Sequence, residues 1–438
     1  MCIRDRDDDY YRSMTVRSSN QKGSVSQKEN ELIIHYDKLV DDSGRIFDTE
    51  FTVHVCVNSN TYESLEFWAE VNNHSDARMN ELQLPFVELS TICAEDHESD
   101  IFFKMNGLGE RIENPWKALE SNHTEYMAAD YNEIWDDVKY PCAASMCWFG
   151  VQSNNHFLYV GKHDEQLRTA TLAAAINPRH SEPKFILAIS HYIMAVENEQ
   201  LESAHAIVSL NEGDWRTGSD IYGNWARNSW YSVPEKPDWV KNMTGWQRII
   251  MRHQYGEVFF TYADLPRVYT EGKEYGLDTL MVFGWWKGRF DNGYPCYEAD
   301  PALGGEDGLK NAIDEVHKLG GRIILYTNGI LIDVSTDYYK ETGYRICHKD
   351  LDGNEYRDHY KFINDGMLLR SFGYKSFVTA CQSTPEWQAV SYTHLDVYKR
   401  QEHVWVCTAL WTAWKIYFLG CPHKTTLHTK MLGLLPIK

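Results

Sequence analysis

The segment LDTLMVFGWW, residues 277–286, decides how the second half of the chain is interpreted. It is almost continuously apolar, as a strand is when both faces of a parallel sheet are covered. Downstream, EDGLKNAIDEVHKLGG (306–321) places apolar side chains at helical spacing and ends in two glycines. Another apolar run, RIILYTNG (322–329), follows directly. A strand, a helix and a strand in this order predict a βαβ unit.

The same alternation extends upstream. GEVFFTYADL (256–265) predicts a further strand that ends in a turn, and LPRVYTEGKEYG (265–276) predicts a helix that Asp264 caps and Gly276 ends. No GxGxxG motif follows the first strand, so a (β/α)8 TIM barrel is preferred to a dinucleotide-binding fold. Residues 246–389 would supply roughly half of such a barrel, which typically needs about 250 residues.

Residues 30–211 have a different period. FTVHVCVN (51–58) and LEFWAEV (65–71) alternate apolar and polar side chains, and many similar short runs are separated by polar turns. This pattern predicts an antiparallel β-sandwich domain. The Trp-rich stretch 212–245 is interpreted as an irregular connector, and residues 7–29 as poorly ordered. The predicted fold class is therefore β-sandwich plus α/β: an N-terminal antiparallel sandwich followed by an incomplete TIM barrel.

Two segments differ from their surroundings: residues 1–6, MCIRDR, and residues 390–401, VSYTHLDVYKRQ. Both can be reverse-translated into one shared DNA word, read in different frames and in both orientations. That word resembles the transposase mosaic end used to prepare sequencing libraries. We therefore expect both segments to be adapter artefacts, the chain to be truncated and chimeric, and the tail 402–438 to be untrustworthy for fold reasoning.

Composition limits the partners. A net charge of −20 at pH 7 disfavours nucleic acid and anionic membrane surfaces, and favours a neutral ligand. Residues 7–389 contain no uncharged apolar run of about 18 residues, so no membrane-spanning helix is expected. The scattered cysteines lack a CxxC pair, which weakly favours a cytoplasmic location. No metal-binding or cofactor-binding motif is present, so no cofactor is expected; the oligomeric state stays open.

In a TIM barrel, the working residues follow the carboxyl ends of the strands. There, aromatic rings would stack on sugar C–H faces, while carboxylates and an amide would hold hydroxyls. Each candidate also has a structural alternative: a helix cap, a turn residue or ordinary core packing. The candidate sugar-binding residues are Asp264, Trp285, Trp286, Asp291, Tyr294, Asp300, Tyr326 and Asn328.

Three stretches carry a family resemblance: MRHQYGEVFFTYADLPRVY (251–269), YGLDTLMVFGWWKGRFDNGYPCYEADPALGG (275–305) and GGRIILYTNG (320–329). They resemble a largely uncharacterised family of glycoside-hydrolase-like barrel proteins, similar to the α-galactosidase-type clan, in which a β-sandwich precedes the barrel. The resemblance implies retaining hydrolysis by two carboxylates about 5–5.5 Å apart. It places the nucleophile after the fourth strand and the acid/base near the sixth, so the catalytic residues are unknown here and are expected to be lost by truncation.

Three functions stay open. The first is a fragment of a retaining glycoside hydrolase that acts on neutral glycosides. The second is a non-catalytic carbohydrate-binding protein, from which the enzyme would differ by a carboxylate at the end of each of the fourth and sixth strands. The third is a scaffold whose Trp-rich connector mediates oligomer contacts. Carbohydrate is the expected partner of the first two, and fold alone does not decide among the three.

Overall fold

The computed structural model describes residues 2–4, 13–58, 63–89, 97–121, 134–140, 143–176, 184–232, 235–349, 353–355, 357–361, 374–381, 384–390 and 405–408. The chain divides into two compact units, Met1–Ser232 and Val233–Lys438. Each unit is described by itself. Among the described residues, no helix is both long enough and apolar enough to cross a membrane.

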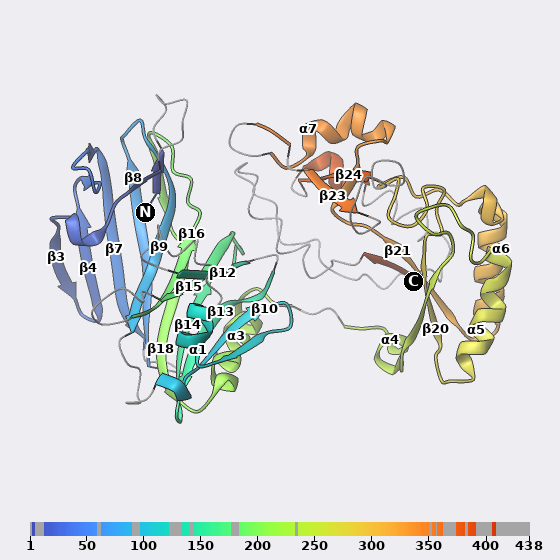
Figure 1. The fold of residues 1–438 in the computed structure, drawn as a ribbon, viewed down its shortest axis with the longest axis horizontal. Helices are drawn as coiled ribbons and strands as arrows, with labels where there is room; N and C mark the ends of the chain where they lie inside the picture. The colour runs from blue at the N-terminus through green and yellow to red at the C-terminus, as the bar shows by residue number, and fades with distance from the viewer. Residues whose placement is uncertain are drawn as a thin grey trace. The chain divides into compact units, whose positions relative to one another are not determined.

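The first unit is a sandwich of antiparallel sheets, as the alternating pattern predicts (Figure 1). One sheet has six strands in the order β12-β15-β16-β9-β1-β2: Ile134–Tyr140, Ala170–Ile176, Phe185–His191, Arg78–Leu89, Cys2–Arg4 and Ser13–Thr15. The other has ten, with β17 (Glu199–Glu202) paired beside β8. The order β11-β10-β13-β14-β18-β8-β7-β4-β3 gives Glu110–Glu113, Ile101–Asn106, Ala144–Ser153, His156–His163, His205–Glu212, Ser64–Asn73, Thr49–Asn58, Glu31–Tyr36 and Ser24–Lys28.

The alternation of apolar and polar residues in β7 determines which side chains face the core of the sandwich. Phe51 belongs to the buried cluster between the sheets, together with Val71 of β8 and Met79 of β9. Its neighbour Thr52 points to the other face, because successive strand residues alternate. The smaller elements of this unit include two short strands, β5 (Leu39–Val40) and β6 (Ile46–Phe47), helix α1 (Pro115–Ser121) and the 3-10 turns η1 (Ser18–Asn20) and η2 (His97–Ser99).

Two expectations about the first unit are wrong. Residues 212–245 are not irregular: Trp215–Ser229 form helix α3, whose N-cap is Asp214, and it packs on β13 and β14. Gly218 permits this contact, since a Cβ there would lie 2.5 Å from the Phe157 ring. Nor is the segment 7–29 poorly ordered throughout, because Ser24–Lys28 pair with β4 in a hairpin.

The adapter interpretation gains no support from the backbone. Cys2–Arg4, which we expected to take no part in the fold, form strand β1 between β2 and β9. Val390 packs partly buried against the cluster that includes Ile332 and Trp387, whereas residues 391–401 lie outside the described part of the chain.

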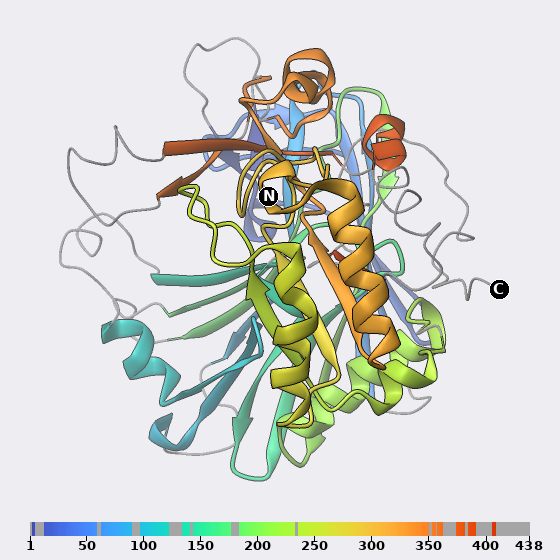
Figure 2. The ribbon, with the colours of Figure 1, turned by 90° about the vertical axis from the view of Figure 1, so that its right-hand side faces the viewer.

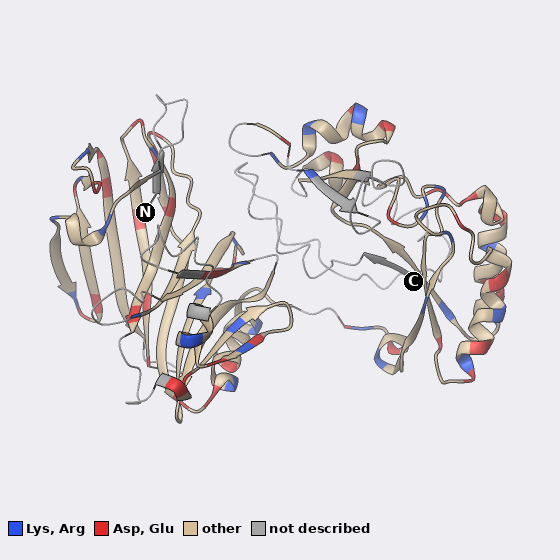
Figure 3. Ribbon diagram, viewed as in Figure 1, with Lys and Arg blue, Asp and Glu red and all other residues tan. Residues whose placement is uncertain are grey.

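The second unit contains a parallel sheet in the order β19-β20-β21-β25, formed by Trp246–Ile250, Thr279–Phe283, Arg322–Thr327 and Trp405–Thr408. Helices α5 (Leu265–Lys273) and α6 (Gly305–Lys318) connect the first three strands and lie side by side over one face of the sheet (Figure 2). The predicted apolar face of α6 is confirmed, since Leu309, Ala312, Ile313 and Val316 are buried. Acidic and basic positions alternate along its length in Figure 3.

The first parallel strand lies upstream of its predicted position. It is Trp246–Ile250, whereas residues 256–261 form no strand and contribute only an isolated bridge between Arg252 and Val258. Arg248 in the middle of this short strand breaks the apolar run on which the prediction depended. The predicted turn before the helix is present, since Tyr262–Asp264 form the 3-10 turn η3, which leads into α5.

The tail also differs from the expectation. Trp405–Thr408 pair in parallel with β21, so residues beyond 401 supply the fourth strand of this sheet. A second, three-stranded sheet has the order β22-β24-β23: Leu331–Asp333, Tyr374–Thr379 and Arg357–Lys361. Short helical segments complete the unit: α4 (Asp238–Asn242), η4 (Pro301–Leu303), η5 (Tyr339–Gly343) and α7 (Tyr344–Ile346). The described strands form an open parallel sheet, and closure into a barrel is not shown.

Candidate functional site

The candidate site lies where the parallel strands end, and a glycine shapes its first loop. After β20 the chain turns at Gly284, which has a φ of +61°. A Cβ there would lie 2.4 Å from the carbonyl oxygen of Arg252, so only glycine fits this approach. The backbone N–H of Phe290 donates to the same carbonyl at 3.1 Å. The loop 284–300 is therefore held against the segment that follows β19.

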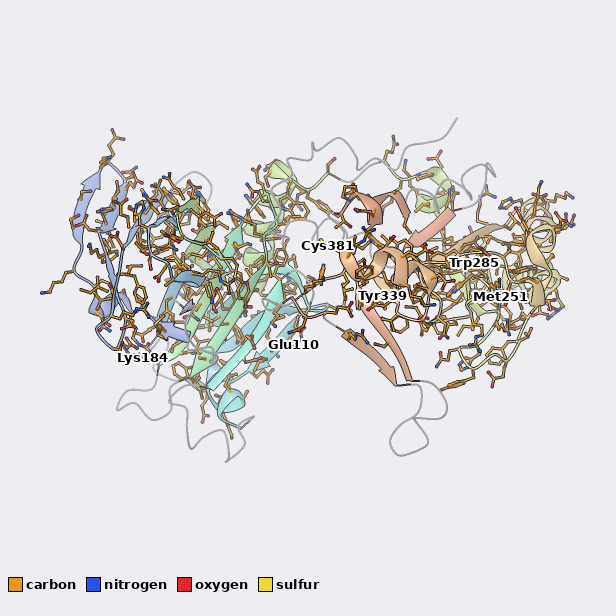
Figure 4. The ribbon with its side chains drawn as sticks, turned by 90° about the horizontal axis from the view of Figure 1, so that it is seen from above. Glu110, Lys184, Met251, Trp285, Tyr339 and Cys381 are labelled. Carbon is orange, nitrogen blue, oxygen red and sulfur yellow. The ribbon has the colours of Figure 1, made fainter. Side chains whose placement is uncertain are left out.

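Trp285 and Trp286 are buried core residues, contrary to the expectation that they form a sugar-stacking surface. Both are 0% exposed, and Figure 4 shows Trp285 among the densely packed side chains of this unit, in the same buried cluster as Met251. Trp285 Nε1 donates to the carbonyl of Tyr326 at 2.9 Å, and Trp286 Nε1 donates to that of Asn292 at 2.8 Å. Fully enclosed rings offer no face to a ligand.

Asp300 and Asp264 both have structural partners. The Asp300 side chain is 3% exposed, and Arg252 Nη1 lies 2.8 Å from its Oδ2. Its Oδ1 accepts from the backbone of Ala302 at 2.9 Å and so caps η4. Asp264 forms a reciprocal capping box with Thr261 at the start of η3. It occupies the N-cap position of α5 but makes no side-chain hydrogen bond to that helix, so the predicted capping of α5 by its carboxylate is wrong. The Thr261 hydrogen bonds are the first cause of a lowered pKa at Asp264.

Asn328 behaves as a turn residue. Its Oδ1 accepts from the backbone N–H groups of Ile330 at 3.0 Å and Leu331 at 2.9 Å. Its backbone N–H donates to the hydroxyl of Tyr297, a ring stacked on Trp285 with centroids 6.0 Å apart. The structure therefore joins Asn328 to the aromatic cluster through its backbone, and its side-chain oxygen is engaged in the turn.

Asp291 is a half-buried carboxylate with a defined orientation. It adopts a left-handed φ of +52°, and its Oδ1 accepts a hydrogen bond from the Tyr294 hydroxyl at 2.9 Å. The loop is anchored further along, where Gly293 N donates to Oδ2 of the buried Asp333 at 2.8 Å. Burial raises the pKa of Asp291, although the Tyr294 bond and the positive charges of Arg248 and His253 oppose that rise.

Tyr294 fixes Asp291 from within the core and does not reach the surface. Its side chain is 0% exposed, and burial raises its pKa, with Tyr326 and Tyr297 adding to the rise. The phenol therefore stays protonated and remains a hydrogen-bond donor. Tyr294 thus positions Asp291, whereas the sequence suggested a direct contact with a ligand.

Beside Asp291, three side chains from neighbouring strands form a stack across the sheet, and a fourth side chain joins it from the loop after β20. Phe283 of β20 and Tyr326 of β21 are stacked, with centroids 4.4 Å apart and planes at 22°. The guanidinium carbon of Arg248, from β19, lies 4.4 Å from the Phe283 centroid and 6.0 Å from that of Phe290. We call these four residues the edge stack. Its strand residues belong to the sheet face opposite the buried cluster of Ile249, Leu280 and Leu325, which packs with α5 and α6.

Sequence reasoning found Tyr326 and missed the rest of the edge stack, and it interpreted His253 as a structural residue. Arg248 was missed because the first strand was placed too late in the chain. The position of Phe283 could have been inferred, because it lies two residues after Met281 in a predicted strand and therefore on the same face, at the end of that strand. Among the described residues, no three His, Cys, Asp or Glu side chains converge in a way that could hold a metal ion.

The sequence matches one family model, described as a domain of unknown function, DUF6259, over residues 201–420. This span is half of the 438-residue chain. The chain belongs to the DUF6259 family. The matched region contains α3, the four parallel strands and residues 390–401, so the family model extends across the segment that we interpreted as an adapter artefact. No curated protein matches the sequence.

Solved structures resemble this DUF6259 chain at low identity. The alpha-N-acetylgalactosaminidase NagBb from Bifidobacterium bifidum, in complex with GalNAc, matches with a TM-score of 0.61 and 14% identity, over 91% of this chain and 62% of NagBb. Its ligand-free form gives a TM-score of 0.59 and 13% identity, over 91% and 63%. The GH36 alpha-galactosidase AgaA from Geobacillus stearothermophilus gives a TM-score of 0.47 and 11% identity, over 88% of this chain and 49% of AgaA. The chain thus spans about 62% of NagBb, and the similarity concerns the fold alone.

Proposed function

We propose that this protein is a glycoside-hydrolase-like, carbohydrate-active protein whose ligand is bound where strands β19, β20 and β21 end. The fold shared with an alpha-N-acetylgalactosaminidase supports the class. The alternation of parallel strands and helices supports the further proposal that the sheet belongs to a (β/α)8 barrel, in which such strand ends carry the functional groups. The acidic composition supports a sugar ligand over nucleic acid.

The observation that carries this proposal is the position of Asp291 beside the edge stack. A sugar presents C–H faces that pack on aromatic rings and hydroxyls that donate to carboxylates. Tyr326 and Phe290 are partly exposed and would supply the aromatic surface, while Asp291, oriented by Tyr294, would accept from hydroxyls. Trp285, Trp286 and Tyr294 would support this surface from beneath, and Asp264, Asp300 and Asn328 would hold the surrounding turns.

For the reaction, we propose retaining hydrolysis by two carboxylates, on the strength of the family resemblance. Asp291 is not assigned as nucleophile or acid/base, because within the described part of the chain it is hydrogen-bonded to Tyr294 and not paired with a second carboxylate. The competing proposal is a non-catalytic sugar-binding protein. It is favoured by the same observation, since a carboxylate beside stacked rings serves binding as well as catalysis.

Calorimetric titration of a panel of methyl hexopyranosides tests the binding proposal. We expect at least one member to bind the wild-type chain and to bind Asp291→Asn about 10- to 150-fold more weakly, which is the effect of losing a charge-assisted hydrogen bond of about 1.5–3 kcal/mol. Asp314→Asn, on the exposed side of α6, is the matched control and should bind normally. A panel without any binder would refute the proposal.

A second experiment distinguishes an enzyme from a non-catalytic binding protein. The protein is incubated with the nitrophenyl glycosides of those sugars that bind. Release of nitrophenol, with the first-formed sugar in the same anomeric form as the substrate, supports the retaining hydrolase. Binding without release supports the non-catalytic protein.

The DNA interpretation of residues 1–6 and 390–401 stays a proposal, carried by the word that the two segments share. Amplifying the genomic locus across the codon of Ala389 tests it. We expect VSYTHLDVYKRQ to be absent from genomic DNA; its recovery there would refute the adapter interpretation.

A further inference from the structure

We infer that the sugar bound at the edge stack carries a carboxylate, and that Arg248 is the residue that recognises it. This inference rests on the proposed function, because it names the ligand class of the same site. The sequence alone favoured a neutral ligand.

The position of Arg248 is the first argument. Its Cα lies opposite Met281 in the parallel register, two residues before the end of β19. The guanidinium nevertheless lies over Phe283 at 4.4 Å and within 6.0 Å of Phe290, which belongs to the loop after β20. The side chain thus extends toward the carboxyl end of the sheet, where the loops gather, and the residue is exposed.

The hydrogen-bonding capacity of Arg248 is the second argument. Two other arginines of this unit are neutralised: Arg252 by Asp300 at 2.8 Å, and Arg267 by Glu271 at 2.7 Å. Within the part of the chain that the structure describes, no carboxylate lies within ion-pair distance of Arg248. The nearby Asp291 bonds to the Tyr294 hydroxyl instead.

The position of the Arg248 guanidinium over the Phe283 ring then favours one class of ligand. A guanidinium that rests on an aromatic ring keeps its N–H groups directed outward in its own plane, and this planar fork matches a carboxylate in a bidentate manner. The ring supports the cation on one side and holds it in place. An Arg in this arrangement is suited to a planar anion beside a sugar ring.

The third argument is the charge close to Arg248, which matters more for a bound ligand than the net charge of the whole chain. The edge of the sheet also carries Arg289, which has no ion pair among the described residues. His253 also acts on Asp291, but its Nδ1 lies 3.6 Å from Oε2 of Glu257, so Arg289 is the second cation that a ligand could meet here. A pocket responds mainly to the charges within about 10 Å, because salt screens the rest. The net charge of −20 disfavours long polyanions but leaves a single carboxylate acceptable at this edge.

Matched ligands test the inference on the full chain. Methyl hexopyranosides, the corresponding methyl hexopyranosiduronates and the 6-O-sulfated hexopyranosides would be titrated calorimetrically. We expect at least one uronate to bind about 10-fold or more tightly than its neutral counterpart. Arg248→Gln should abolish that preference, while Arg248→Lys, which keeps the charge but lacks the fork, should retain part of it.

Arg322→Gln is the matched control, because Arg322 lies on the same face of the same sheet at the opposite end of its strand. It should leave the uronate preference unchanged, and a change equal to that of Arg248→Gln would overturn the inference. Neutral hexosides that bind as well as uronates would also overturn it while leaving the proposed function intact. Preference for the sulfated sugar would overturn the carboxylate assignment, and absence of all binding would refute the proposed function itself.

Discussion

The hydroxyl of Tyr294, a side chain with no exposed surface, donates a hydrogen bond to Asp291 Oδ1 at 2.9 Å. A buried donor thereby fixes a half-buried carboxylate at the edge of the parallel sheet. Asp291 also adopts a left-handed backbone conformation, with a φ of +52°, that few residue types accept without strain. Orientation from the core and backbone strain at the same residue are typical of functional positions, because such strain persists where the surroundings enforce it.

Asp291→Asn should separate function from stability. Asn tolerates the left-handed conformation, so the backbone is kept while the charge is lost. Burial raises the pKa of Asp291 above its usual 3.8, so the folded state holds the proton more strongly than the unfolded state. Ionisation at neutral pH therefore opposes folding, and this effect disappears below pH 3.8, where both states are protonated.

We accordingly expect Asp291→Asn to be at least as stable as the wild type in urea at pH 7 and to lose any such advantage at pH 3.5, while binding sugar more weakly. Tyr294→Phe is the partner variant. It removes the donor that lowers the Asp291 pKa, so that pKa should rise further. If Asp291→Asn instead unfolds readily and binds normally, Asp291 is only a turn residue.

Trp285→Ala should be costly to stability, because the ring is buried in the aromatic cluster. Deleting a buried Trp side chain typically lowers the free energy of unfolding by about 3–5 kcal/mol. Tyr275→Ala is the control: that ring is 84% exposed in the same unit, and its removal should change stability by no more than about 0.5 kcal/mol. Urea unfolding of both variants checks this. Equal stabilities would mean that the Trp285 site collapses around the loss.

Asp300→Asn should destabilise the fold without acting on the ligand directly. Asn can still cap η4, so the substitution removes only the ion pair with Arg252 and its effect on stability reports on that pair. Removing one partner of a buried pair leaves the other charge uncompensated, at a cost of about 3 kcal/mol here, since Arg252 is 25% exposed and partly hydrated. In a double-mutant cycle, Arg252→Met should rescue part of that loss. Additive effects would show that the pair is not coupled.

Regular periodicity made parts of this fold predictable. The apolar face of α6 and strands β20 and β21 were read correctly, because each presents an unbroken pattern of one period. The first strand was misplaced because it is only five residues long and carries Arg248 at its centre. Helix α3 was overlooked because its Gly and Trp content resembles a loop, although its buried positions 218, 221, 222 and 226 follow helical spacing.

The site was predicted in outline only. Sequence placed Asp291, Tyr326 and the two tryptophans near strand ends, and the structure puts them in one region. It gave no means of deciding which aromatic rings are enclosed, because Trp285 is buried by Tyr297, a residue twelve positions away in a loop of irregular structure. The ion pair of Asp300 with Arg252 and the bond of the Asn328 backbone to Tyr297 likewise come from tertiary contacts.

Two histidines of the sandwich face each other across neighbouring strands and have opposite pKa shifts. His163 of β14 pairs with His205 of β18. Burial lowers the pKa of His163 to about 3, and its ring stacks on Trp225 of α3, with centroids 4.5 Å apart. The pKa of His205 is raised, first by its hydrogen bond to Glu66, and its ring stacks on Trp68 at 4.8 Å.

These shifts predict opposite pH dependences of stability for the two residues. Between pH 6.5 and about 3, His163 stays neutral in the folded state but is protonated in the unfolded state. Its contribution to stability therefore falls by about 1.4 kcal/mol per pH unit as the pH drops through this range. His205 stabilises the fold fully below pH 6.5, and that contribution is lost as pH rises through its raised pKa. In urea unfolding across pH 4–9, His163→Gln should flatten the acidic limb of the stability curve, and His205→Gln should flatten the basic limb. Burial also lowers the pKa of His191 to about 3. The stability of His163→Gln should therefore still fall somewhat at acidic pH. If both limbs of the stability curve are unchanged in the two variants, neither imidazole determines the pH dependence of the stability of the sandwich.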